Sequence, residues 1–236
     1  MIFYPAAYDS SMRAGFLRKL FGLLCVLSAI SVFMTIAFAV FYANRRTVSV
    51  LERFYFLVST EENVPASSIN AYLSGGAGYV MRYGGKEYAV LSVYFSPVEA
   101  ENVAKRVSKT RSVAVLSVEA GKLYLTRRAD KRRTGEIVGF FKTLREGIRV
   151  VSEIAIRAEK GERQSVLKSL LFNVQSVIER LFVQSEKYGK GLSTLLERGA
   201  TEVCFTDGEI VYSKDVRFLQ ALLCDAYLQA ANNFLL

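Results

Sequence analysis

The chain has 236 residues, a formal net charge of +9 and no histidine. Histidine is the usual general base near neutral pH and the commonest metal ligand, so its absence excludes Ser-His-Asp and Cys-His nucleophile systems and two-histidine zinc sites. A carboxylate-only or Ser-Lys mechanism stays open, but no paired signature points to one, and no glycine stretch has the pattern of a phosphate-binding loop. We expect no enzyme activity, catalytic residue, cofactor or metal.

Residues 21–42 are predicted to form a transmembrane helix. The run FGLLCVLSAISVFMTIAFAVFY contains no charged residue. As a helix it spans roughly 33 Å, compared with about 30 Å for the hydrocarbon core of a bilayer. Ala37-Phe38-Ala39 resembles a signal-peptidase site, but the run is longer than a signal core and continues to Tyr42. A retained anchor is therefore favoured over a cleaved signal, with residues 1–20 as a short N-terminal segment before it.

Charge alone does not orient this anchor. Basic residues near the ends of a membrane helix tend to stay in the cytoplasm. Three precede the segment and three follow it closely: Arg13, Arg18 and Lys19, then Arg45, Arg46 and Arg53. The count is a tie, so the side that carries the rest of the chain depends on what that part is.

Residues 53–126 follow a βαββαβ pattern. Runs of aromatic and β-branched residues predict strands, and apolar residues spaced three and four apart predict helices. Gly84-Gly85 is a tight hairpin signal, and Ser96-Pro97 with Glu99 suggests a capped helix start. The expected strands are 53–59, 79–83, 87–95 and 112–119, with 122–125 completing the last strand or a hairpin, and the expected helices are 61–74 and 97–109. This order is the ferredoxin-like arrangement, with two helices on one face of a four-stranded sheet.

The residues from 54 to 125 resemble the SPOR domain, the sporulation-related repeat of bacterial envelope proteins. The resemblance begins with an aromatic first strand, FYFLV at 54–58. The stretch GGAGYVMRYGGKEYAVLSVYFS at 75–96 adds a Gly-x-Gly-Tyr motif, a glycine hairpin and a Tyr-x-Val strand. The helix start SPVEAENV at 96–103 is similar to the family's s-x-e-e-A motif.

This resemblance implies a noncatalytic module outside the cytoplasmic membrane that binds the glycan strands of peptidoglycan. It also decides the orientation, because family members often have a short cytoplasmic N-terminus and a single membrane anchor. The resemblance therefore implies that residues 1–20 are a cytoplasmic N-terminal segment. Stacking and hydroxyl contacts to sugar would come from side chains on or near the first and third strands. The expected ligand-binding residues are Tyr55, Ser59, Tyr79, Arg82, Tyr88, Ser92 and Tyr94. The alternative for each of them is ordinary packing in a half-buried sheet.

Three positions depart from the family pattern. The typical first strand carries a glutamine where this chain has Leu57, and the typical third strand carries arginines where it has Ala89 and Leu91. The resemblance places these positions on an open sheet face that contacts sugar, where polar groups fix the orientation of the ligand. Either the C-terminal region covers this face, or the face recognises something more apolar.

Residues 134–236 are predicted to be mainly helical. Apolar stripes along 136–160 and 162–187, separated by Gly161, predict an antiparallel helical hairpin. A final helix is expected at 215–232. The region packs on itself and over the sheet, or it offers a surface for self-association or for another envelope protein.

A small β-hairpin is expected within this helical region. Residues 202–205 and 209–212 flank Thr206-Asp207-Gly208, a turn sequence. Cys204, beside this turn, and Cys224 pair if the domain faces an oxidising space; otherwise they are two isolated thiols.

Residues 127–133 hold five basic side chains and one acidic one. Such a cluster attracts nucleic acid, anionic lipid or an anionic wall polymer, or it is a solvated linker. No aromatic RNA-binding motif accompanies it, so a nucleic-acid partner is not expected.

The sequence thus predicts an α+β, single-pass membrane protein with its SPOR-like domain outside the cell membrane. Its expected role is binding peptidoglycan in cell-wall remodelling at division or sporulation. The alternative is a noncatalytic envelope interaction or assembly protein whose SPOR-like fold has lost sugar binding.

Overall fold

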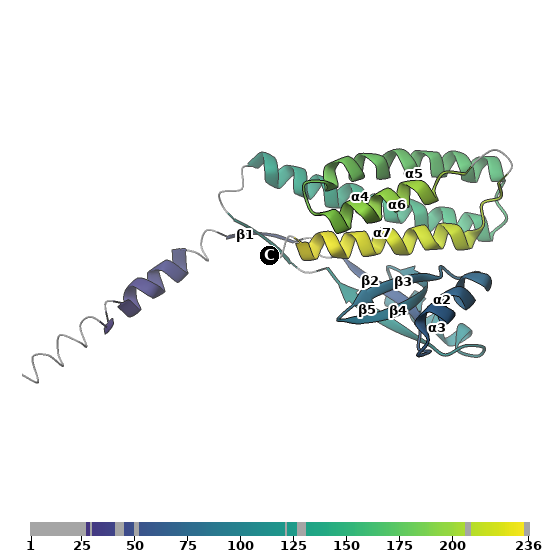
Figure 1. Ribbon diagram of the computed structural model, residues 1–236, viewed down its shortest axis with the longest axis horizontal. Helices are drawn as coiled ribbons and strands as arrows, with labels where there is room; N and C mark the ends of the chain where they lie inside the picture. The colour runs from purple at the N-terminus through teal and green to yellow at the C-terminus, as the bar shows by residue number, and fades with distance from the viewer. Residues whose placement is uncertain are drawn as a thin grey trace, which may run out of the picture. The chain divides into compact units, whose positions relative to one another are not determined.

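A four-stranded antiparallel sheet organises the first half of the folded chain (Figure 1). The computed structural model describes residues 27, 28, 30–40, 45–49, 52–120, 122–126, 131–205 and 209–233. The strands are β2 (Arg53–Ser59), β3 (Tyr79–Tyr83), β4 (Lys86–Tyr94) and β5 (Val113–Glu119). They lie in the order β3-β4-β2-β5, and each neighbouring pair is antiparallel. With the two helices between them, this confirms the predicted βαββαβ order and its ferredoxin-like strand arrangement.

Helices α2 (Val64–Leu73) and α3 (Pro97–Val107) cover one face of the sheet. The core between them contains Leu57, Leu91 and Ala100, all buried. Ser96 stands at the N-cap of α3 as predicted, but its side chain makes no capping hydrogen bond. The capping box is therefore not formed, and Pro97, with its preset φ, begins the helix.

The glycine pair between β3 and β4 forms the predicted tight turn. Gly84 and Gly85 have φ values of 58° and 76°, and Tyr83 pairs with Lys86 across the turn. Two consecutive positive φ values define the hairpin turn whose twist matches that of the strands, and glycine adopts them without a steric cost. The turn thus fixes the register of β3 against β4.

Four helices form the second half of the molecule: α4 (Lys131–Glu159), α5 (Gln164–Ser185), α6 (Lys190–Glu202) and α7 (Ser213–Asn233). Helices α4 and α5 pack against each other, which confirms the predicted helical hairpin. Helix α6 was not expected, although Leu192, Leu196 and Gly199 recur on its buried face. The predicted domains, 53–126 and 134–236, pack into one compact unit of residues 47–125 and 129–236.

The predicted β-hairpin at 202–212 is wrong in its described part. Glu202 ends α6, and residues 204, 205 and 209–212 are not in strands, while residues 206–208 lie outside the described residues. A side chain takes the place of a partner strand: Gln164 Nε2 donates to the Val211 carbonyl at 3.3 Å, and the Val211 N–H donates to Gln164 Oε1 at 2.8 Å. This segment is therefore held by α5 in an irregular conformation.

Helix α7 lies between the sheet and the other helices. It packs against α4 and α6 on one side and against β3 and β4 on the other. Residues 219–228 are consecutively buried, so no face of this stretch meets solvent. Tyr227 shows the arrangement, because its ring packs edge-on against Phe54 of β2, at 5.4 Å between centroids, and against Phe141 of α4, at 5.0 Å. The sheet face opposite α2 and α3 is therefore interior.

The N-terminal part is described only in segments. Residues 27, 28 and 30–40 are helical, and all their side chains are exposed. The other residues of the predicted 21–42 span, and all of 1–20, lie outside the described residues. Among the helices that the structure describes, none has both the length and the hydropathy needed to cross a membrane. Strand β1 (Arg45–Ser49) pairs with β6 (Lys122–Thr126), so 122–126 does not extend the four-stranded sheet.

The close packing of α6 on α7 depends on Gly199. A Cβ atom at this position would lie 3.2 Å from Leu222 Cδ2 and 3.7 Å from Ile178 Cγ2. We expect Gly199→Leu to lower the free energy of unfolding by about 1–3 kcal/mol through overpacking. Gly135→Ala, where a Cβ meets nothing within 4 Å, is the matched control and is expected to stabilise by about 0.5–1 kcal/mol. Chemical denaturation of both variants checks this, and equal effects would contradict the close approach.

Candidate functional site

The seven residues predicted to bind glycan do not share an open surface. Tyr79 and Tyr88 face the helical half, with Tyr79 only 3% exposed. Tyr55 and Tyr94 face α3 on the other side of the sheet, and Ser92 is buried. Ser59, at the end of β2, accepts a hydrogen bond from the Glu61 N–H, and Arg82 is exposed in an ion pair with Glu87. The fold distributes the predicted set over two covered faces and the sheet margin.

An irregularity in β4 explains part of this distribution. Leu57 pairs with Ser92 whereas the next residue, Val58, pairs with Val90, so Leu91 is an extra residue in the strand. Such a bulge changes which side chains share a face. Leu91 and Tyr94, three residues apart, consequently both face α2 and α3, whereas Val90 and Val93 both face the helical half. Ser92 lies on the side of Tyr94, and its hydroxyl donates to the Tyr94 hydroxyl at 2.9 Å. Strict alternation along the sequence would place Leu91 and Tyr94 on opposite faces, so it does not predict this arrangement.

Polar contacts fix the position of α7 on the sheet and on α2. The Tyr79 hydroxyl donates to Asp225 Oδ2 at 2.6 Å, inside the core. The Tyr72 hydroxyl of α2 donates to Asp215 Oδ1 at 2.6 Å, near the start of α7. Since polar groups in a core are costly unless they are hydrogen-bonded, the buried Tyr79–Asp225 pair favours one register of α7 over its neighbours, and the half-buried Tyr72–Asp215 pair supports the same register.

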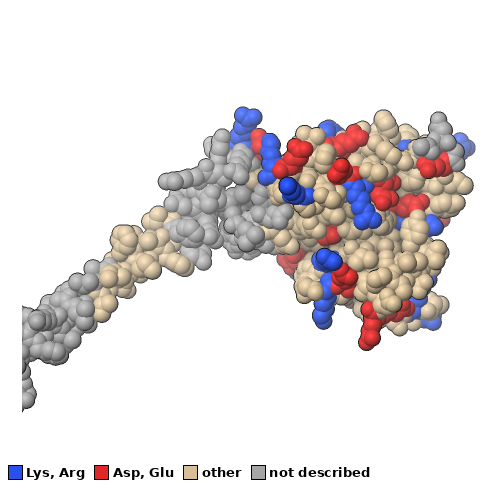
Figure 2. Space-filling view, viewed as in Figure 1, with Lys and Arg blue, Asp and Glu red and all other residues tan. Residues whose placement is uncertain are grey.

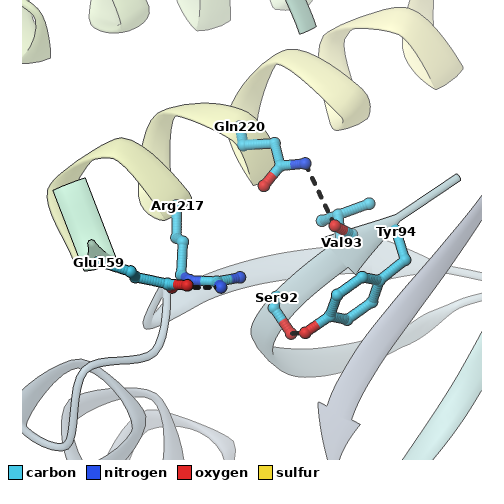
Figure 3. A network of polar contacts seen from close by, with 6 residues as sticks. All are labelled: Ser92, Val93, Tyr94, Glu159, Arg217 and Gln220. Carbon is cyan, nitrogen blue, oxygen red and sulfur yellow. Dashed lines mark hydrogen bonds and ion pairs between the residues drawn. The ribbon is translucent and has the colours of Figure 1, made fainter. Parts of the chain in front are cut away.

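A third contact lies at the end of β4, where Figure 3 shows a small polar network. Gln220 of α7 is 1% exposed, and its Nε2 donates to the Val93 carbonyl at 3.1 Å. One turn earlier on α7, Arg217 forms an ion pair with Glu159 of α4. Both α7 side chains line a cavity of about 220 Å³ that also reaches α3. This volume is below the usual range for small-molecule sites.

The buried pair of Tyr79 and Asp225 has perturbed ionisation. Burial raises the pKa of Asp225, although the hydrogen bonds from Tyr79 and Gln229 act in the opposite direction. Burial and the nearby Asp225 also raise the pKa of Tyr79. The hydrogen bond to Asp215 raises the pKa of Tyr72 to about 12. These shifts accompany contacts that hold α7 in place, and neither tyrosine sits beside a base that would ionise it near neutral pH.

A larger cleft of about 770 Å³ lies between α2, α6 and the segment before α7. Ile69 and Leu73 of α2 and Ile210 line it and are more than half exposed. The Lys214 ammonium lies above the rings of Tyr72 and Tyr212, at 4.3 Å and 5.3 Å from their centroids. Exposed apolar side chains with mixed charges around them are typical of surfaces that contact other proteins.

The surface shown in Figure 2 carries acidic and basic side chains interspersed rather than gathered by sign. Arg132, in the basic cluster at 127–133, pairs with Glu136 within α4, while residues 127–130 lie outside the described residues. Cys204 is exposed and Cys224 is buried, and neither is in a disulfide. In the described part of the chain, no three acidic or cysteine side chains are grouped so that they could hold a metal ion.

Comparison with models of protein families, with curated proteins and with solved structures finds no match for this chain. The SPOR resemblance therefore stands on the sequence motifs and on the strand order alone.

The buried carboxylate of Asp225 predicts a specific pH dependence. A carboxyl group whose pKa is raised by folding stabilises the protein while it is protonated, and this contribution is lost as pH rises through the raised pKa. Asparagine does not titrate, so Asp225→Asn should not lose stability in this way. We expect the free energy of unfolding of the variant to increase relative to that of the wild type from about pH 4 to pH 7. Tyr79→Phe, which removes a hydrogen bond from a buried carboxylate, should cost about 1–3 kcal/mol at pH 7. Denaturation across pH measures both, and a pH-independent difference for Asp225→Asn would contradict the assignment.

Proposed function

We propose that this protein is a noncatalytic interaction or assembly protein of a bacterial cell envelope, anchored in the membrane by residues 21–42. The observation that carries the proposal is the burial of both sheet faces, one under α2 and α3 and the other under α7. The resemblance to the SPOR family places sugar on an open sheet face. Leu57 and Leu91, which the resemblance places on that face, lie instead under α2 and α3, and the opposite face, which carries Phe54, Phe56 and Val90, is covered by the helical half. The SPOR-like half then serves as a structural support for the helical half.

Opening the sheet to a glycan would be costly. Removing α7 exposes four buried leucines, Leu219, Leu222, Leu223 and Leu228, among other residues. At about 1.5–3 kcal/mol for each side chain, these leucines alone contribute roughly 6–12 kcal/mol. Millimolar binding, by comparison, provides about 4 kcal/mol. A weak sugar ligand therefore does not displace α7.

The membrane anchor is supported by sequence and by exposure. The uncharged run at 21–42 is long enough to cross a bilayer, and its described portion is helical with apolar side chains exposed all around, Phe33 at 73%. The hydroxyl of Thr35 donates to the Ser31 carbonyl at 2.8 Å, so the helix itself satisfies this polar group. We place the N-terminus in the cytoplasm and residues 45–236 outside, on the orientation that the SPOR resemblance implies.

The proposal predicts no binding to peptidoglycan. Full-length protein in mild detergent is expected to stay in the supernatant when amidase-treated cell wall is sedimented, whereas a SPOR domain with an open sheet, as positive control, co-sediments. Tyr88→Ala and Arg82→Ala should leave this result unchanged, because neither side chain belongs to a sugar site. Saturable co-sedimentation that either substitution weakens would contradict the proposal and restore the glycan-binding hypothesis.

The proposed orientation is tested separately. Reporters that are active on one side of the membrane only, fused after Leu236, should report an extracytoplasmic C-terminus. The same reporters at the N-terminus should report the cytoplasm. A cytoplasmic C-terminus would overturn the envelope assignment, and the basic residues at 127–133 would then face nucleic acid and the inner lipid leaflet.

A further inference from the structure

A groove of about 540 Å³ runs along the surface between α4 and α5. Its floor is apolar, with Gly147, Val150, Val174 and Val177 buried or half-buried. Its margin is polar and exposed, formed by Lys142, Thr143, Glu146 and Asn173 together with Gly139. An apolar floor with a polar rim is the usual plan of a protein interface.

The glycines of this groove are not needed by the fold around them. Gly139 and Gly147 lie in the interior of α4, where glycine costs about 0.5–1 kcal/mol relative to alanine. A Cβ at Gly139 would meet nothing within 4 Å, and one at Gly147 would make only an ordinary contact of 3.9 Å with Val177. A Cβ at Gly199, in contrast, would lie only 3.2 Å from Leu222 Cδ2, closer than side chains usually pack. A glycine facing open space in mid-helix instead permits the close approach of another backbone.

The charges on the groove margin indicate which kind of chain supplies this second backbone. Lys142 and Glu146 are four residues apart on one helix, yet neither forms an ion pair with any residue that the structure describes. A lysine preceding a glutamate is the less favourable order for an intrahelical pair. Both charges are exposed and free to meet a partner.

The pattern is self-complementary under a two-fold axis near Thr143. In an antiparallel pair of α4 helices centred there, Gly139 of one copy lies opposite Gly147 of the other. Lys142 then lies about two residues, or roughly 3 Å along the helix axis, from the level of Glu146 of the other copy, within reach of its long side chain, and the reverse pair forms by symmetry. A parallel pair would instead place Lys142 beside Lys142. Isologous contacts of this kind are characteristic of two-fold dimers, and rim charges set their orientation.

We propose that the groove binds a second copy of this chain, through antiparallel packing of α4 against α4. This inference rests on the proposed function, since it names the partner of the interaction protein. The two proposals can fail separately. If the chain is monomeric and does not bind cell wall, the dimer proposal is wrong and the proposed noncatalytic, wall-independent role stands.

The test measures the self-association of full-length protein in mild detergent, by light scattering after size exclusion and by energy transfer between labelled copies on dilution. The wild type should have twice the protein mass of the 26.4 kDa chain. Lys142→Glu and Glu146→Lys should each weaken the dimer about tenfold or more, because each places like charges together. The double variant should return to within about threefold of the wild type.

Two further variants separate the interface from folding. Gly139→Leu should abolish the dimer without lowering the melting temperature, because a Cβ at this exposed position meets nothing within 4 Å and leucine favours the helix more than glycine does. Lys105→Glu, an exposed charge reversal on α3, is the matched control and should leave the dimer unchanged. A monomeric wild type would overturn the proposal. A dimer whose affinity is unchanged by the charge reversals would also overturn it, since the apolar N-terminal segment or a different surface would then hold the two copies together.

Discussion

The burial of residues 219–228 of α7 on all sides is the constraint on which the rest of this structure depends. A helix that is apolar around its whole circumference is stable in water only when every face is covered. In α7 the covering comes from two sources: the sheet on one side, and α4 with α6 on the other. The ring of Tyr227 contacts both, through Phe54 and Phe141. The sheet and the helices are therefore parts of one core, and neither half retains the face that it would expose alone.

Polar groups within this core determine how α7 is placed rather than how strongly it is held. Hydrophobic contacts are nondirectional, so a helix that is buried through a nearly all-apolar stretch such as 219–228 can slide or rotate at small cost. The buried pair of Asp225 with Tyr79 and the bond from Gln220 to the Val93 carbonyl each permit one position only. Burying Asp225 opposes its ionisation, as the raised pKa indicates. Burying Asp225 thus lowers the stability of the fold, and the geometry indicates that the buried pair instead makes the packing of α7 specific.

Much of the fold was predictable because the signals are local. The strands at 53–59 and 79–83 match β2 and β3, and the glycine turn and the α4–α5 hairpin follow from period and turn chemistry. Helix α6 is not predicted because its apolar stripe is short. The predicted 202–212 hairpin does not form in its described part because the side chain of Gln164, distant in sequence, makes the hydrogen bonds of the Val211 backbone. The site was harder to predict. The resemblance places Leu57 and Leu91 on the sugar-facing side of the sheet, but both pack under α2 and α3, and periodicity neither identifies α7 as the cover of the other face nor detects the bulge at Leu91.

The central claim, that α7 seals the sheet, can be tested with the chain's own thiols. Cys224 lies on α7 and is 0% exposed, and burial raises its pKa, whereas Cys204 is exposed. Maleimide added to the folded full-length protein should label Cys204 promptly and Cys224 only as slowly as the protein unfolds, with both labelled in denaturant. Peptide mass spectrometry distinguishes the sites. Labelling of Cys224 at the rate of Cys204 would contradict the account, since α7 would then leave the sheet readily and the sheet face would be available to a ligand.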